Sequence, residues 1–335
     1  MEGWKLNSGK LNTIFLDDEK VWNYFNIIFS SRSVNKTSYK FGFIRSLIEN
    51  LYNVDSSLCL NFDFIYNSFS RLYWNLVIEN KLKQVDRSHK LSAVEKIFFS
   101  MQREHGIPEG VHFDILPIEL QRFCIKQIKK ECKRFVVGAI YGDTGGTFYE
   151  FDLKKEVLRL HPIVYEFMLS NQEVLYRLSN YEMIKYLLKI NTLDAGVNIV
   201  DKVENITRRK TLEFFKLLLK KQDEKRCFYC DKSIEIGAKF THLDHFIPWS
   251  FLHSDPLWNF VWACRKCNLG KKDKIAVSIF LEKLIDRNEQ LLLSSDQLIK
   301  KQLVNYDKGK MFKLYNYSKI NGFISDWTPV KSSES

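Results

Sequence analysis

The sequence contains little proline and glycine and has no long apolar run. Six prolines and 14 glycines among 335 residues are too few for a collagen-like or disordered chain, and 45% hydrophobic residues provide material for buried cores. No apolar run approaches the roughly 18–20 residues of a membrane-spanning helix. Residues 1–20 also lack the continuous apolar segment of a secretory signal. We therefore expect a soluble, cytoplasmic protein of two or three domains with no membrane partner.

The chain has seven cysteines, an odd number, so they cannot all pair with one another. They do not indicate the disulfide framework of a small secreted protein. Four of them form two Cys-x-x-Cys pairs near the C-terminal third of the chain. The other three lie in apolar, helix-like sequence, where a free cysteine usually behaves as a small buried hydrophobe. These three are Cys59, Cys124 and Cys132.

Positive charge is concentrated in the C-terminal part of the chain. The protein has 51 Lys and Arg against 40 Asp and Glu, a net charge of +11. Residues 201–335 hold 25 basic and 17 acidic residues, compared with 26 and 23 in residues 1–200. This excess indicates a polyanion partner such as nucleic acid, although lysines that only maintain solubility would give the same count.

Helical periodicity dominates residues 1–200. Between residues 135 and 160, β-branched and aromatic residues surround a Gly-Asp-Thr-Gly-Gly sequence, which predicts a β hairpin or a small three-stranded sheet. We expect an α-rich multidomain protein whose helical N-terminal domain, residues 1–200, has this small β insertion. A basic connector helix is expected at 201–226. Its run Arg208, Arg209 and Lys210 either contacts a nucleic-acid backbone or forms an ordinary solvated helix face.

The two cysteine pairs enclose the residues with the strongest chemical signal. Tetrahedral zinc takes four thiolates, and the two-residue gap within each pair lets both sulfurs face one ion. Between and after the pairs, the sequence predicts a strand that ends before Pro248, a long loop, a second strand and a Lys-rich segment that leads into a helix. The pairs are Cys227 with Cys230 and Cys264 with Cys267.

This segment resembles the HNH endonucleases, which have a ββα-metal fold. The run Leu243-Asp244-His245-Phe246-Ile247-Pro248-Trp249-Ser250-Phe251-Leu252, followed by Asn259 and then by Asn268 with nearby lysines, is especially similar to the HNH domain of RNA-guided CRISPR effector nucleases. The cysteine pairs resemble those of zinc-bearing members of the family. The resemblance covers residues 227–274 and implies an HNH domain at 227–291, followed by a C-terminal extension at 292–335.

The resemblance also implies a role for each of these residues. His245 would be the general base that takes a proton from water, and Asp244 and Asn268 would hold one divalent cation. Asn259 would fix the long loop so that His245 faces the phosphate, and the four cysteines would bind structural zinc. Because the amide oxygen at 268, where many members have His, is a hard ligand, it favours Mg²⁺ or Mn²⁺.

The implied activity is phosphodiester hydrolysis that leaves a 5′-phosphate and a 3′-hydroxyl. A free imidazole with a pKa near 6.5 can accept the water proton at neutral pH. We expect double-stranded DNA as the substrate and a role in anti-phage defence or restriction. The N-terminal domain would recognise the target, bind a sensor or defence partner protein, or form a homo-oligomer. The residues expected to contact phosphate are Arg265, Lys266, Lys271, Lys272 and Lys274.

Several alternatives stay open at this point. The protein could be a non-catalytic, zinc-stabilised nucleic-acid-binding or adaptor protein. Asp143 with Asp152-Leu153-Lys154 weakly resembles a D…(D/E)xK nuclease core, although Asp143 fits a Gly-rich turn better. His242 could be a further metal ligand and His253 a phosphate contact, but structural or surface roles are simpler. Structural roles are expected for the remaining histidines, His89, His105, His112 and His161.

Overall fold

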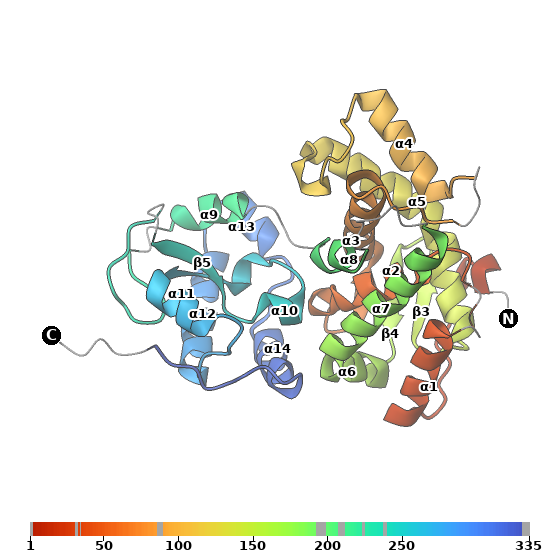
Figure 1. The fold of residues 1–335 in the computed structure, drawn as a ribbon. Coiled ribbons are helices and arrows are strands. Elements are labelled where there is room, and N and C mark those ends of the chain that lie inside the picture. Colours follow the sequence, from red (N-terminus) through yellow and green to blue (C-terminus); the bar gives the residue numbers. More distant parts are fainter. Residues whose placement is uncertain are drawn as a thin grey trace. The chain divides into compact units, whose positions relative to one another are not determined.

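The chain folds into two compact units, residues Met1–Arg208 and Arg209–Ser335. The structure is a computed structural model and is 59% helical, which confirms the expected α-rich, multidomain class (Figure 1). In the part of the chain that the structure describes, no helix combines the length and hydropathy needed to span a bilayer. The described residues are 3–30, 33, 35–85, 90–191, 199–206, 212–222, 225–236 and 240–329.

The N-terminal unit is built from helices that bury aromatic side chains. Helix α4 illustrates how local sequence sets the helix ends. It begins with a capping box between Ser92 and Glu95 and ends at Gly106, whose φ of 61° suits a residue without a Cβ atom. The described helices of this unit are α1 (Asp18–Phe29), α2 (Tyr39–Ile48), α3 (Phe62–Trp74), α4 (Ala93–His105), α5 (Ile118–Asp143), α6 (Pro162–Ser170), α7 (Gln172–Ile190) and α8 (Ile199–Asn205).

A four-stranded sheet accompanies these helices, with strand order β1-β3-β4-β2. The central hairpin is antiparallel and pairs Phe151 with Leu158, so both side chains lie on the buried face. Two short segments from earlier in the chain extend this hairpin on either side, which the sequence did not predict. The strands are β1 (Ser8–Gly9), β2 (Cys59–Asn61), β3 (Tyr149–Asp152) and β4 (Val157–Leu160).

The hairpin is shorter than the predicted span of 135–160. Residues 135–143 continue helix α5 instead of forming a strand, and the sheet resumes only at Tyr149. Val136, Val137 and Ile140 are all buried on this extension. Their packing against the core outweighs the modest preference of β-branched residues for strands.

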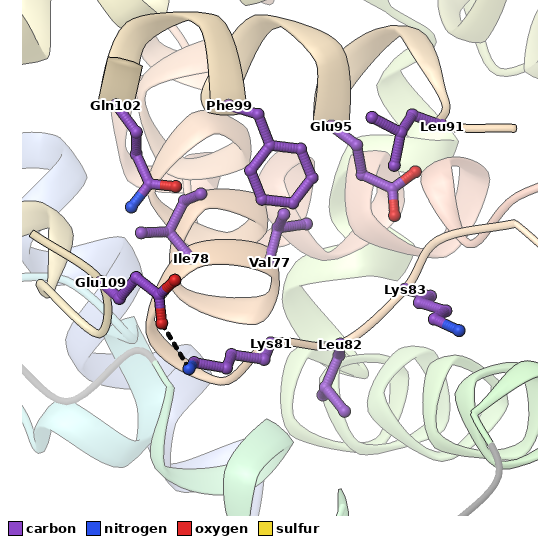
Figure 2. Close-up of a pocket in the computed structure, with 10 residues that line it drawn as sticks. All are labelled: Val77, Ile78, Lys81, Leu82, Lys83, Leu91, Glu95, Phe99, Gln102 and Glu109. Carbon is purple, nitrogen blue, oxygen red and sulfur yellow. Dashed lines mark hydrogen bonds and ion pairs between the residues drawn. The ribbon is translucent and has the colours of Figure 1, made fainter. Parts of the chain in front are cut away.

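A groove in the N-terminal unit is lined by both apolar and charged side chains. Figure 2 shows Val77, Ile78 and Phe99 pointing into it, while an ion pair between Lys81 and Glu109 spans its edge at 2.6 Å. Both partners of this ion pair are exposed, so the pair contributes little stability. The side chains lining the groove include no histidine or cysteine.

The C-terminal unit contains the predicted strand, loop, strand and helix. Strands β5 and β6 are antiparallel, pairing Thr241 with Cys264 and His245 with Phe260, and a short helix follows β6 directly. This arrangement confirms the expected ββα fold with four clustered cysteines. The described elements are α9 (Glu213–Lys220), β5 (Thr241–His245), α10 (Trp249–Leu252), β6 (Phe260–Cys264), α11 (Arg265–Lys271), α12 (Ser278–Leu292), α13 (Gln297–Gln302) and α14 (Lys308–Ile320).

The segment expected as one connector helix, residues 201–226, overlaps two described helices. Helix α8 ends at Asn205 in the N-terminal unit, and α9 begins at Glu213 in the C-terminal unit. The basic run at residues 208–210 lies outside the described residues, as does His89.

Candidate metal centre and nuclease site

The four paired cysteines converge on one point of the C-terminal unit. Their Sγ atoms all lie within 4.8 Å of one another, and those of Cys230 and Cys264 are 3.8 Å apart. A zinc ion with four Zn–S bonds of about 2.3 Å would hold its sulfurs roughly 3.8 Å apart. Both the donor set and the spacing therefore fit a tetrahedral zinc ion.

Burial affects the protonation of two thiols of this cluster. Burial raises the pKa of Cys227 and of Cys267, so neither thiol readily loses its proton without a cation nearby. Because a metal binds the thiolate form, ion binding at this cluster must release protons. The backbone N–H of Cys264 donates to the sulfur of Cys227 at 3.3 Å, a hydrogen bond that stabilises the thiolate.

Asp244 lies near the end of β5 and is buried, with 6% of its surface exposed. Its Oδ2 atom accepts a hydrogen bond from the hydroxyl of Tyr229 at 2.5 Å and lies 3.2 Å from Nζ of Lys271. Burial and the Asp244 carboxylate raise the pKa of Tyr229 well above its ordinary value, so the hydroxyl keeps its proton and acts as the donor. The other oxygen, Oδ1, accepts no hydrogen bond from any residue that the structure describes.

His245 follows directly and is held by a second carboxylate. Its Nε2 atom lies 2.7 Å from Oδ1 of Asp255, which is 5% exposed and comes from the loop between the two strands. The imidazole also packs on the ring of Phe260, with 4.6 Å between the ring centroids. Because an ionised carboxylate only accepts hydrogen bonds, Nε2 is the donor of this pair when Asp255 is ionised.

Asn259 joins the two ends of the loop between β5 and β6. Its side-chain oxygen accepts from the backbone N–H of Ile247, and its side-chain nitrogen donates to the carbonyl of the same residue, both at 2.8 Å. The side chain is fully buried. Since these bonds satisfy both backbone groups of Ile247, Asn259 fixes the path of the chain immediately after His245.

Asn268 lies on α11, one residue after Cys267, and is partly exposed. Among the described residues its carboxamide has no hydrogen-bond partner, so its oxygen is available to a ligand. The same short helix packs against both β5 and β6. Helix α11 therefore carries both Asn268 and one member of the cysteine cluster, Cys267.

Lys271 differs from the expected phosphate contact. It is fully buried, and its ammonium group donates to the carbonyl of His245 at 2.6 Å in addition to its ion pair with Asp244. A lysine held inside the domain in this way is not a surface contact for nucleic acid, so the expectation is corrected for this residue. Of the other expected contacts, Arg265, Lys266 and Lys272 are exposed and Lys274 is partly exposed.

A second set of basic side chains lies beside the first cysteine pair and was missed from the sequence. A groove there is lined by Lys225, Arg226, Lys283 and Arg287, with one acidic residue, Asp231. Lys283 and Arg287 come from α12, about 55 residues after the cysteines that they approach. The helical periodicity of α12 alone did not indicate which of its charged residues would face this groove.

The remaining histidines have varied surroundings. His242 is partly exposed on β5, and its Nε2 atom has no hydrogen-bond partner among the described residues. His253 is buried, with its ring against that of Trp249. In the N-terminal unit, the three described histidines have local structural contacts: His112 bonds Asn75, His161 caps α6 and His105 packs on Phe123.

The alternative nuclease core in the N-terminal unit has structural partners instead of an open cation site. Asp143 accepts from Lys40 at 2.7 Å and from Ser33 at 2.8 Å. Asp152 accepts the backbone N–H groups of Lys154 and Lys155, which closes the hairpin turn. Each carboxylate therefore has a local role in the fold.

Comparison with known proteins identifies one part of the chain. Residues 227–277 match the family model of the HNH endonucleases. No curated protein and no solved structure matches the chain. The matched segment contains the four cysteines, both strands, helix α11 and each of Asp244, His245, Asn259 and Asn268. The C-terminal unit of this chain therefore contains an HNH endonuclease domain at residues 227–277.

Proposed function

We propose that the protein is a divalent-metal-dependent endonuclease that hydrolyses phosphodiester bonds of DNA. The observation that carries this proposal is that His245, paired with the buried Asp255, follows Asp244 at the end of β5, where one oxygen of the Asp244 carboxylate has no hydrogen-bond partner among the described residues. A candidate proton acceptor and a candidate hard cation ligand are thus consecutive residues of a segment that matches the HNH endonucleases. Metal-assisted hydrolysis of a phosphodiester with a side-chain general base uses both groups at one place.

His245 acts as the general base in this proposal. With its Nε2 proton directed at Asp255, the imidazole presents Nδ1 to a water molecule that attacks the phosphorus. Asp255 fixes the tautomer and stabilises the imidazolium that forms when the water proton is taken. Asn259 supports this geometry because it holds the backbone two residues after His245.

Asp244 and Asn268 hold the catalytic Mg²⁺ or Mn²⁺. Their donor set is a carboxylate oxygen and an amide oxygen, both hard ligands, and neither atom is engaged by another described residue. When bound, the cation polarises the phosphate and stabilises the negative charge that develops on the leaving 3′ oxygen. The four cysteines hold a structural zinc ion that ties β6 and α11 to the first cysteine loop.

The substrate class follows from charge and shape. The exposed basic residues of α11 and the groove beside the first cysteine pair provide cations at separate places on the same unit, as contacts along a nucleic-acid backbone require. We assign DNA as the substrate and cytoplasmic anti-phage defence or restriction as the setting. Residues 1–200 then supply target recognition, a docking site for a sensor protein, or a homo-oligomer contact, and 201–226 connect them to the nuclease domain.

Removing the cation ligand should weaken metal binding rather than proton transfer. For Asp244→Ala we expect cleavage to need a much higher Mn²⁺ concentration, with part of the rate recovered at saturating metal. The measurement is the initial rate of plasmid cleavage over a Mn²⁺ titration. Asp273→Ala is the control, since it removes an exposed carboxylate from the same segment. If Asp244→Ala and wild type have the same Mn²⁺ dependence, Asp244 is not a cation ligand.

A further inference from the structure

The cysteine cluster and the catalytic carboxylate are physically connected through Tyr229. This tyrosine lies between Cys227 and Cys230, in the loop that the first cysteine pair closes, and is 5% exposed. Its ring packs edge-on against those of Phe280 and Trp327, at 5.5 and 5.1 Å between centroids. These contacts direct its hydroxyl to Oδ2 of Asp244, 2.5 Å away.

A second connection runs through the other cysteine pair. Helix α11 carries Cys267 in its first turn and Lys271 at its end. The ammonium group of Lys271 lies 3.2 Å from the same Oδ2 atom of Asp244 and also donates to the carbonyl of His245. Thus each of the two segments that the cysteines join delivers one donor to a single carboxylate oxygen.

We propose that the zinc site positions the catalytic cation ligand: by joining the first cysteine loop to α11, it aligns Tyr229 and Lys271 on Oδ2 of Asp244 and leaves Oδ1 for the divalent cation. This inference rests on the proposed function, because it assigns to Asp244 the role of cation ligand. Tyr229 and Lys271 are positioning residues, since they act through Asp244 and do not touch the substrate. The zinc site then has a role in activity as well as in folding.

The energetic reason is that rotation of an aspartate side chain lowers its affinity for a cation. A free aspartate side chain can rotate and can present either oxygen, so ordering it on metal binding lowers the affinity. A hydrogen bond from a hydroxyl to an ionised carboxylate is short and strong, and a buried partner of this kind fixes the ligand before the metal arrives. Loss of such an outer partner typically weakens metal binding or activity about 10–100-fold.

Tyr229→Phe tests the connection with the smallest change. It keeps the ring and its packing and removes only the hydroxyl. With full-length, zinc-loaded protein and no nucleic acid, we expect the dissociation constant for Mn²⁺, measured by electron paramagnetic resonance, to rise about 10–100-fold. Zinc content and melting temperature should stay close to wild type. In plasmid cleavage the half-saturating Mn²⁺ concentration should rise by a similar factor, and saturating metal should restore most of the rate.

Tyr315→Phe is the matched control. Tyr315 is also a buried tyrosine of the C-terminal unit, and its hydroxyl donates to the carbonyl of Ala276 at 2.8 Å, not to Asp244. Its Mn²⁺ affinity should equal that of wild type. An unchanged Mn²⁺ affinity in Tyr229→Phe, with a wild-type protein that binds Mn²⁺ and cleaves, would overturn this inference alone. A wild-type protein that neither binds Mn²⁺ nor cleaves would instead overturn the proposed function.

Discussion

His245→Ala should lower the rate of plasmid cleavage about 10²–10⁴-fold, because a positioned general base contributes a factor of this size. Nucleic-acid affinity should change little, since the base acts on the water proton in the transition state and makes few contacts in the ground state. Zinc content should also be unchanged, because His245 is not part of the cysteine cluster. Single-turnover cleavage, a binding isotherm and metal analysis on the same preparation measure the three quantities.

His105→Ala serves as the control for this experiment. His105 is exposed at the end of α4 in the N-terminal unit, so its loss should leave cleavage at the wild-type rate. Wild-type cleavage by His245→Ala would remove this histidine from the mechanism. Loss of binding in parallel with cleavage would indicate that His245 holds the substrate and does not move a proton.

Cys267→Ser should have the largest effect on stability. The thiol is buried within the cluster, and a hydroxyl is a poor replacement for a thiolate ligand. Because metal binding free energy in such small modules is largely folding free energy, the C-terminal unit should lose most of its resistance to trypsin. Wild-type protein purified without added metal should contain about one zinc ion per chain, and the variant far less.

Cys124→Ser provides the comparison. This cysteine is buried in α5 of the N-terminal unit and is not one of the four clustered cysteines, so the change removes a buried thiol without removing a ligand. Its zinc content should match wild type. A Cys267→Ser protein that keeps its zinc and its trypsin resistance would exclude the proposed zinc site.

The sequence predicted the ββα motif because its signals are local. Cysteine spacing indicates the candidate metal ligands, Pro248 follows the end of the first strand, and helix α11 begins within the second cysteine pair, directly after Cys264. The predicted C-terminal end of helix α5 was wrong, because the local strand propensity of residues 135–143 conflicts with their packing in the core. Pairing of the remote strands β1 and β2 with the hairpin depends on the tertiary fold and leaves no periodic pattern.

The partners of the site residues were not predictable. Tyr229 precedes Asp244 by 15 residues, and Asp255 follows His245 by 10, so each contact depends on the path of an irregular loop. Lys271 was expected at the surface because lysine is seldom fully buried, and only its carboxylate and carbonyl partners account for its position. Residue type and spacing indicated the candidate reacting groups, whereas the fold determines which groups contact them.

Incubation of zinc-loaded wild-type protein with supercoiled plasmid and Mg²⁺ tests the central claim most directly. The proposed mechanism predicts conversion to nicked circles that a DNA ligase reseals, since the ends would carry a 5′-phosphate and a 3′-hydroxyl, and complete inhibition by a chelator that removes Mg²⁺. Failure of the folded, zinc-loaded protein to cleave any DNA or RNA with Mg²⁺ or Mn²⁺ would contradict the account and favour a non-catalytic nucleic-acid-binding protein.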